Sequence, residues 1–138
     1  MQTSSLIFPM LALVLLTFVV MYSMLVLRVN AVKQRKVSPR YFKLNKGGEI
    51  PEQMEAVSQN YTNLFELPTL FYSVCIVVMV LGLHADYFIY HAWAFVFFRY
   101  VHSYIHTTYN HILHRLAAFA ISGLILLSMW IQLVLMIV

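Results

Sequence analysis

One stretch of the sequence, from Arg99 to Arg115, carries polar side chains at a spacing that could do chemistry. At about 100° per residue, members of this stretch share a helix face of about 120°; they are Arg99, His102, Ser103, His106, Tyr109 and Asn110. Histidines in such a row could transfer protons, bind a metal or form buried hydrogen bonds. Because ionisable groups at membrane depth are costly, they usually face a bundle interior or a wet cavity. We therefore expect this polar stripe to point inward and to mark a functional site.

A second, shorter polar stripe opens the apolar segment that precedes it. Its side chains project within about 60° of one another on a helix; they are Gln59, Asn63 and Glu66. Pro68 projects to the opposite side and predicts a kink, because it has no N–H for the helix ladder. A short link at about 84–87 makes the two helices antiparallel neighbours, with Glu66 level with about residue 105. Glu66 is then the expected counter-ion of the polar stripe.

The composition sets the class of protein that must hold these stripes. The chain has 138 residues, of which 62% are apolar and only 10% charged, whereas a soluble domain has about 25% charged residues. We therefore expect an integral membrane protein. The net charge of +4 does not indicate nucleic-acid binding, because seven of the nine Lys and Arg residues lie in segment 28–46. A membrane explains such a cluster directly.

The apolar runs predict four transmembrane helices in one membrane domain, residues 1–138. The expected spans are about 5–27, 61–83, 88–110 and 116–138, with a basic loop at 28–58. Each run is long enough to cross a hydrocarbon core of about 30 Å. The fold class is an all-α membrane protein, a four-transmembrane-helix antiparallel bundle. Because the connections at 28–58 and 111–115 carry the Lys and Arg, the positive-inside rule predicts that they are cytoplasmic and that both termini lie outside.

Two motifs on the second and third spans resemble those of a known family, the membrane-associated proteins in eicosanoid and glutathione metabolism. Asn63-Leu-Phe-Glu66-Leu-Pro68 is similar to the family's Asn-x-x-Glu followed by Pro. Arg99-x-x-His102, with Arg115 sixteen residues after Arg99, is similar to the pattern of its prostaglandin synthase branch. The sequence departs from many eukaryotic members at Gln59, where they have Arg, and at His106, where they have Tyr. It therefore looks like a bacterial member, and the inner membrane is its expected location.

The resemblance implies a homotrimer that binds glutathione as co-substrate between neighbouring protomers, near the cytoplasmic side. It implies that Arg115 holds the thiolate, and His106, in the place of the family's Tyr, could donate a hydrogen bond to the thiol or act as a base. The remaining candidate glutathione-binding residues are Asn63, Glu66, Arg99, His102, Tyr109 and Gln59. The implied function is a glutathione-dependent transferase or peroxidase that acts on hydrophobic electrophiles. On an unbroken helix the side chain of Arg115 would point about 160° away from that of Arg99. Either the connection before the fourth span redirects this side chain, or Arg115 belongs to the site of a neighbouring protomer.

Two other classes of function are compatible with parts of the pattern. A non-catalytic membrane scaffold or lipid-binding protein can have the same fold, and the neutral Gln59 favours it. A haem or metal protein is suggested by the pair His102 and His106, but haem ligation across a bundle needs histidines from two facing helices. Because no predicted span other than the third carries a histidine, the sequence predicts no metal site.

Overall fold

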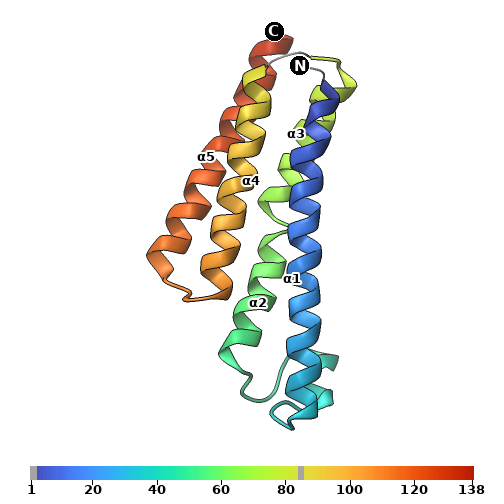
Figure 1. Cartoon of the computed structure of the whole chain (residues 1–138), viewed down its shortest axis with the longest axis vertical. Coiled ribbons are helices and arrows are strands. Elements are labelled where there is room, and N and C mark those ends of the chain that lie inside the picture. The colour runs from blue at the N-terminus through green and yellow to red at the C-terminus, as the bar shows by residue number, and fades with distance from the viewer. Residues whose placement is uncertain (1–2, 84–85) are drawn as a thin grey trace.

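The computed structural model describes residues 3–83 and 86–138 as a bundle of long helices (Figure 1). Its elements are η1 (Thr3–Leu6), α1 (Ile7–Lys33), η2 (Pro39–Lys43), α2 (Glu52–Asn63), α3 (Leu67–Val80), α4 (Asp86–Thr107) and α5 (Ile112–Ile137). Both ends of the chain lie at one end of the bundle, and the α1–α2 connection lies at the other (Figure 1). The predicted turn at 84–87 includes residues 84 and 85, which lie outside the described residues.

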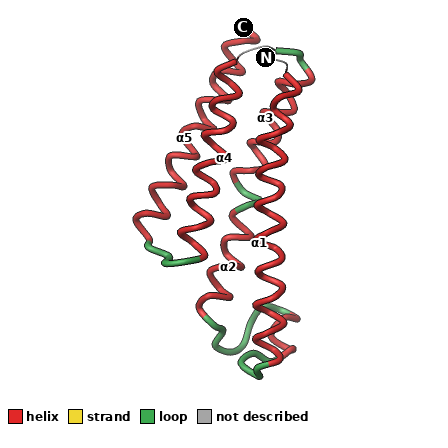
Figure 2. The backbone as a smooth tube through the Cα atoms, viewed as in Figure 1, coloured by secondary structure: helices red, strands yellow, loops and turns green. Residues whose placement is uncertain are grey.

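The second predicted span is two helices with a break between them. α2 ends at Asn63 and α3 begins at Leu67, and the intervening loop lies within the helical column (Figure 2). Pro68 occupies the first turn of α3, where its missing N–H costs nothing. The predicted kink is confirmed, and it is sharper than expected because the chain leaves helical geometry at Glu66, with φ −89° and ψ −96°.

The helices pack in pairs around an apolar core. α4 forms its largest contact with α5, while α1 packs on α2, and α3 packs on α5. In the half of the bundle near the termini, the rings of Phe71 and Phe95 stack at a centroid distance of 4.6 Å, and Leu13 and Met129 are fully buried. This half has the close packing of a protein interior.

The register between the second and third spans differs from the expected one. Ser103 donates a hydrogen bond to Asn60, and Phe71 stacks on Phe95, so the two segments are antiparallel as predicted. Glu66 lies about midway between Asn60 and Phe71, which places it level with about residue 99 and not with residue 105. The prediction was wrong because it placed α3 too close to α4 in sequence: α3 ends at Val80 and α4 begins at Asp86, so the connection centres on about residue 83 rather than on residues 85 and 86.

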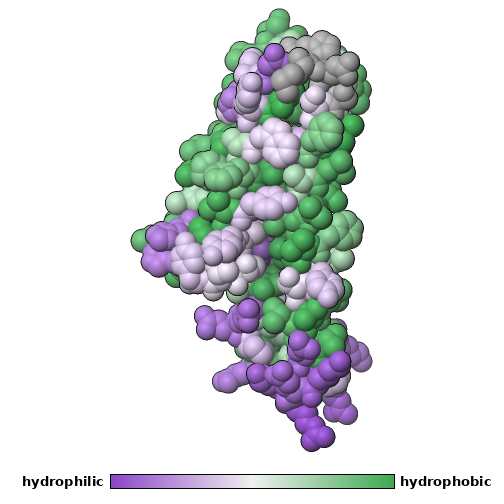
Figure 3. All heavy atoms as spheres, viewed as in Figure 1, coloured by the Kyte–Doolittle hydropathy of each residue, from purple (hydrophilic) through white to green (hydrophobic). Residues whose placement is uncertain are grey.

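The outer surface of the bundle is that of a membrane protein. By length and composition, three described segments can cross a membrane, namely Ile7–Lys33, Glu52–Val80 and Ile112–Ile137. Large apolar side chains such as Phe18, Leu124 and Leu135 are exposed over these helices, which a soluble monomer would not tolerate over such an area. Hydrophilic residues gather at the end that carries the α1–α2 connection (Figure 3). The all-α membrane bundle is confirmed.

α4 is not among these three segments, because its polar residues lower its hydropathy. Its 22 residues nevertheless extend about 33 Å at ~1.5 Å per residue, long enough to cross beside α5. α4 ends at Thr107, not at residue 110 as expected. The connection to α5 therefore occupies 108–111 in place of 111–115, and Arg115 belongs to the first turns of a helix.

Candidate functional site

The buried part of the polar stripe lies on α4. Arg99, His102, Ser103 and His106 are each at most 3% exposed, so the prediction that this face points inward is confirmed for these four residues. The face meets α2 on one side and α5 on the other. A helix thus buries four polar side chains in a bundle whose other contacts are mainly apolar.

Arg99 is bonded to the break between α2 and α3. Its Nη2 donates to the carbonyl oxygen of Asn63 at 3.0 Å, and its Cζ lies 5.7 Å from the ring centroid of Phe119. In the described part of the chain, Nε and Nη1 have no hydrogen-bond partner. The guanidinium therefore hydrogen-bonds the carbonyl of Asn63, while the exposed carboxylate of Glu66 attracts it through charge alone. Glu66 is thus a counter-charge of Arg99, as expected, but not its hydrogen-bond partner.

His102 is held by the backbone of α5. Its Nδ1 lies 3.1 Å from the carbonyl oxygen of Arg115, and because a carbonyl only accepts, Nδ1 is the donor. This bond fixes the neutral tautomer with Nε2 as a free acceptor, and Nε2 has no partner among the described residues. The ring of His106 lies 5.5 Å away, nearly perpendicular to that of His102.

His106 is only 1% exposed, yet neither of its ring nitrogens has a partner in the described part of the chain. A buried polar atom without a partner costs about 1–3 kcal/mol. The structure thus retains groups that a purely structural core would satisfy or replace.

These side chains surround a cavity of about 480 Å³ between α2, α4 and α5, which we call the thiol cavity. Its volume is in the range of small-molecule sites. It is lined by Gln59, Thr62, Asn63, Glu66, His102, His106, Ile112, Arg115, Leu116 and Phe119. Six of these ten were singled out from the sequence, namely Gln59, Asn63, Glu66, His102, His106 and Arg115.

Arg115 reaches this cavity because the chain turns between α4 and α5. Asn110 adopts a left-handed conformation with φ 45°. The backbone therefore changes direction between α4 and α5. The side chain of Asn110 then accepts a hydrogen bond from Nη1 of Arg115 at 2.9 Å. The connection between α4 and α5 thus directs the side chain of Arg115 into the cavity of its own chain, which is the first of the two alternatives considered for this residue.

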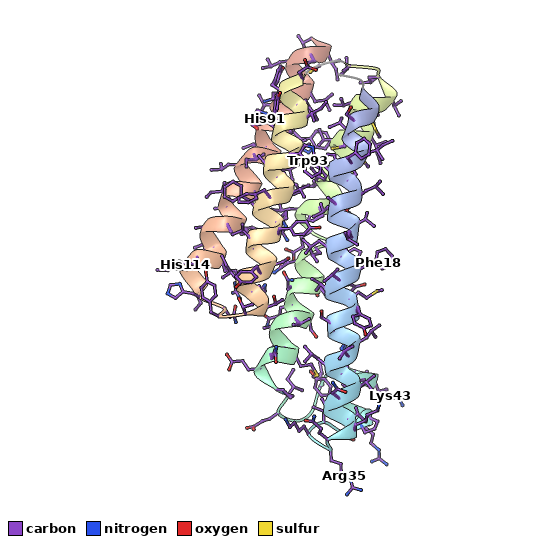
Figure 4. All side chains as sticks on the ribbon, in the orientation of Figure 1. Phe18, Arg35, Lys43, His91, Trp93 and His114 are labelled. Carbon is purple, nitrogen blue, oxygen red and sulfur yellow. The ribbon has the colours of Figure 1, made fainter. Side chains whose placement is uncertain are left out.

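Two residues predicted for the inward face do not lie there. Tyr109 is 56% exposed, and its hydroxyl lies 3.1 Å from Nδ1 of His114. His114 itself projects outward at the α4–α5 connection (Figure 4). Asn110 likewise lies outside α4 and bonds Arg115. The prediction was wrong because α4 ends at Thr107, after which its periodicity no longer applies.

Sequence reasoning missed several residues of this region. Asn60 is fully buried and accepts the hydrogen bond of Ser103 at 3.2 Å, although no motif pointed to it. Phe119 lines the thiol cavity four residues after Arg115, so the helical period could have found it. Ile112 and Leu116 belong to the same apolar wall.

A metal centre is not favoured by the arrangement. His102 and His106 both belong to α4, and the described residues contain no group of three or more His, Cys, Asp or Glu side chains that could hold a metal ion. The facing helix α5 carries His114 near this end of the bundle, but its side chain is exposed and projects outward, so it cannot complete a haem site with His102 or His106 (Figure 4). The site is instead a cavity with cationic, imidazole and carboxylate groups on one side and apolar groups on the other.

Comparison with known proteins agrees with this arrangement. The sequence model of the MAPEG family matches residues 6–135, nearly the whole chain. No curated protein and no solved structure matches the chain. A match over this length covers all the long helices and the thiol cavity, so the chain belongs to the MAPEG family of membrane proteins.

Proposed function

We propose that the protein is a glutathione-dependent transferase or peroxidase that acts on hydrophobic electrophiles. The observation that carries the proposal is the thiol cavity, where Arg115 of α5 and His106 of α4 meet Glu66 from the break between α2 and α3. Family membership supports the use of glutathione, since the family includes glutathione transferases and peroxidases. The unpaired nitrogens of His102 and His106 beside this cavity offer hydrogen bonds that a polar ligand could use.

Arg115 is the residue that would stabilise the thiolate. A free thiol has a pKa of about 8.5, so it must be lowered by one to two units to be largely ionised at pH 7. That corresponds to about 1.4 to 2.8 kcal/mol, which one well-placed guanidinium can supply. Asn110 accepts from only one nitrogen of Arg115, so the guanidinium keeps other donors for a sulfur anion.

The other polar groups of the thiol cavity match the rest of glutathione. Its ammonium group fits the carboxylate of Glu66, and its amide groups fit Asn63 and Gln59. His102 offers a fixed acceptor at Nε2, while His106 offers both ring nitrogens. We assign His106 as the group that hydrogen-bonds the thiol and accepts its proton. Arg99 acts on the site through the carbonyl of Asn63, and Tyr109 is not part of it.

The apolar wall of the cavity explains why the electrophile would be hydrophobic. Ile112 and Leu116 line the cavity, and they are 69% and 58% exposed on the outside of the bundle. An electrophile dissolved in the bilayer could therefore approach past α5, while glutathione meets the polar groups of α2. The thiolate sulfur then attacks the electrophilic carbon and displaces its leaving group. With a hydroperoxide it attacks the distal oxygen, the O–O bond breaks to release the alcohol, and a second glutathione converts the resulting sulfenic acid to the disulfide and water. Binding both reactants in one cavity supplies the proximity.

An exposed polar stripe on α2 and α3 supports a homotrimer. Polar residues recur along the membrane-crossing segment Glu52–Val80 at alternating spacings of four and three residues, and all are exposed in the single chain; they are Glu55, Gln59, Thr62, Glu66, Thr69 and Ser73. Facing lipid, such a row would be unfavourable. We infer that copies of the chain cover it and that Glu66 and Gln59 lie near a neighbouring protomer.

We also propose that the basic connection between α1 and α2 is cytoplasmic, in a bacterial inner membrane. The side chains of Arg35 and Lys43 project from that end of the bundle (Figure 4). Single cysteines at Gln34 and Leu81, in a Cys75→Ser background, should then label oppositely with an impermeant thiol reagent in intact cells. Labelling at Gln34 without labelling at Leu81 would invert the topology.

Turnover by the purified protein tests the proposed function. Glutathione consumption is measured in detergent or lipid nanodiscs with an apolar aryl halide and, separately, with an organic hydroperoxide. Conjugate formation indicates a transferase, and glutathione disulfide with the alcohol indicates a peroxidase. A protein that neither binds glutathione nor consumes it would instead be a scaffold of this fold.

A further inference from the structure

A groove of about 590 Å³ lies between α1 and α4, on a different side of α4 from the thiol cavity. Tyr104 and Thr107 of α4 line this groove, whereas His102 and His106 of the same helix line the thiol cavity. We call it the α1–α4 groove. Its apolar wall comes from α1 and α2 and consists of Leu16, Val19, Val20, Val26, Leu27 and Val57.

The groove extends over the depth of one leaflet of a bilayer. Tyr100 lies at its inner end, where its hydroxyl donates a hydrogen bond to the carbonyl oxygen of Ala12 at 2.7 Å. From Leu16 to Leu27, the part of α1 that lines the groove rises about 16 Å. One leaflet of a hydrocarbon core is about 15 Å thick. The groove therefore has the length that an acyl chain lying parallel to the helices would occupy.

The hydroxyl groups of the groove are already satisfied by the protein. Ser23 donates to the carbonyl oxygen of Val19 at 2.9 Å, and Thr107 donates to that of Ser103 at 2.8 Å. The hydroxyl of Ser103 itself donates to Asn60 at 3.2 Å. Because these donors are used, the middle of the groove presents a surface suited to hydrocarbon and not to a polar ligand.

Polar side chains continue the line of the groove beyond its outer end. Ser23, Val26, Asn30 and Lys33 follow one another on α1 at spacings of three, four and three residues, so they share one helix face, and all four are exposed. Ser23 and Val26 line the groove. Lys33 lies in the last turn of α1, about 10 Å beyond Val26, which is the depth of lipid headgroups.

The charge at this end favours an anionic headgroup. Lys33 has no acidic partner among the described residues. Segment 28–46 carries seven Lys and Arg residues and no Asp or Glu. Such a cluster attracts anionic lipids to the membrane surface. A headgroup with a net negative charge therefore gains more at Lys33 than a zwitterionic one.

The groove also stays accessible to lipid in the homotrimer proposed above. Gln53 and Val57 line the groove on α2, and they project about 180° away from the exposed stripe that contains Glu55, Gln59 and Thr62. Copies of the chain that meet along that stripe therefore leave the groove facing the bilayer.

We propose that the α1–α4 groove is a binding site for one anionic phospholipid per chain. One acyl chain lies along the groove between α1 and α4, and the phosphate binds the ammonium group of Lys33. The lipid fills the space between two helices that share the hydrogen bond from Tyr100 to Ala12. The site is separate from the thiol cavity and takes no part in the thiol chemistry.

The test is a lipid titration of the full-length, detergent-solubilised protein, followed by native mass spectrometry. Phosphatidylglycerol should bind the wild-type protein about fivefold more tightly than phosphatidylcholine with the same acyl chains. Lys33→Gln should abolish this preference. Lys46→Gln removes an exposed charge from the same connection outside α1, so it is the matched control and should keep the preference.

A second pair of variants tests the acyl chain. Val26→Trp fills the groove from an exposed position and should weaken the binding of both lipids by at least about tenfold. Leu124→Trp, at an exposed position of α5 outside the groove, is its control and should weaken neither. If Val26→Trp does not fold, Val19→Phe, at another exposed position of the groove, should weaken both lipids in the same way.

The outcomes separate the two parts of the proposed site. Equal affinity of the wild-type protein for the two lipids, or an equal loss from Lys33→Gln and Lys46→Gln, would overturn the headgroup site at Lys33. Unchanged affinity after the groove is filled would overturn the acyl-chain site. Binding of neither lipid by the wild-type protein would mean that another chain covers the groove, which also contradicts the proposal.

Discussion

The two halves of the bundle satisfy their buried groups differently. Near the termini, apolar side chains such as Phe71, Phe95 and Met129 fill the space between the helices. Toward the α4–α5 connection, the same helices bury Arg99, His102 and His106 with five of their nitrogen atoms unpaired in the described residues. A core built only for stability would not retain such groups. The comparison supports our proposal that one half holds the bundle together and the other binds a ligand.

The largest effect on stability should come from the apolar half. Phe71→Ala removes a fully buried ring from its stack on Phe95 and should lower the free energy of unfolding by about 3–5 kcal/mol. Glutathione affinity of the folded protein should not change. Thermal unfolding in detergent measures the loss, with Phe97→Ala, a ring 61% exposed, as the control. An equal shift for both variants would contradict the assignment of the core.

The polar half should respond in the opposite direction. His106→Phe replaces a ring whose two nitrogens have no partner in the described structure, so it should raise the free energy of unfolding by about 1–3 kcal/mol. Turnover should fall at the same time. His91→Phe is the matched control on α4, because its nitrogens contact the Tyr87 carbonyl at 2.8 Å and Gln132 at 3.4 Å. A stabilised His91→Phe, or a destabilised His106→Phe, would remove the contrast between the halves.

Glu66 should affect binding with little effect on stability. Its side chain is exposed in the single chain, so Glu66→Gln should change the free energy of unfolding by no more than about 0.5 kcal/mol. Because an amide cannot pair with the ammonium of glutathione, affinity should fall about tenfold. Calorimetry beside Glu49→Gln, an exposed loop position, checks this. An unchanged affinity would exclude Glu66 from the site.

The sequence predicted the parts of the site that depend on one helix. The helical period placed Arg99, His102 and His106 on the inward face, because a single helix fixes their relative directions. The prediction failed at Tyr109 because it placed Asn110 on the polar stripe and not at the C-terminal end of α4, where a left-handed Asn is common. No Gly or Pro stands there, and Asn110 takes the left-handed conformation in their place.

Features that depend on two helices could not be predicted in the same way. The direction of Arg115 depends on the path of the connection and on its bond to Asn110. The height of Glu66 beside α4 depends on where α3 ends and α4 begins. The bond from Arg99 to the carbonyl of Asn63 depends in turn on how the break brings that carbonyl next to α4. The kink itself was predictable, because Pro68 acts through its own backbone.

Thiolate formation in the thiol cavity tests the central claim most directly. Glutathione is added to the purified protein, and the thiolate is followed by ultraviolet difference absorbance near neutral pH. The wild-type protein and the control Arg40→Ala, which alters an exposed residue of η2, should give the thiolate signal. Arg115→Ala should lose it while keeping its fold. The absence of a signal in the wild-type protein, or an undiminished signal in Arg115→Ala, would contradict the account.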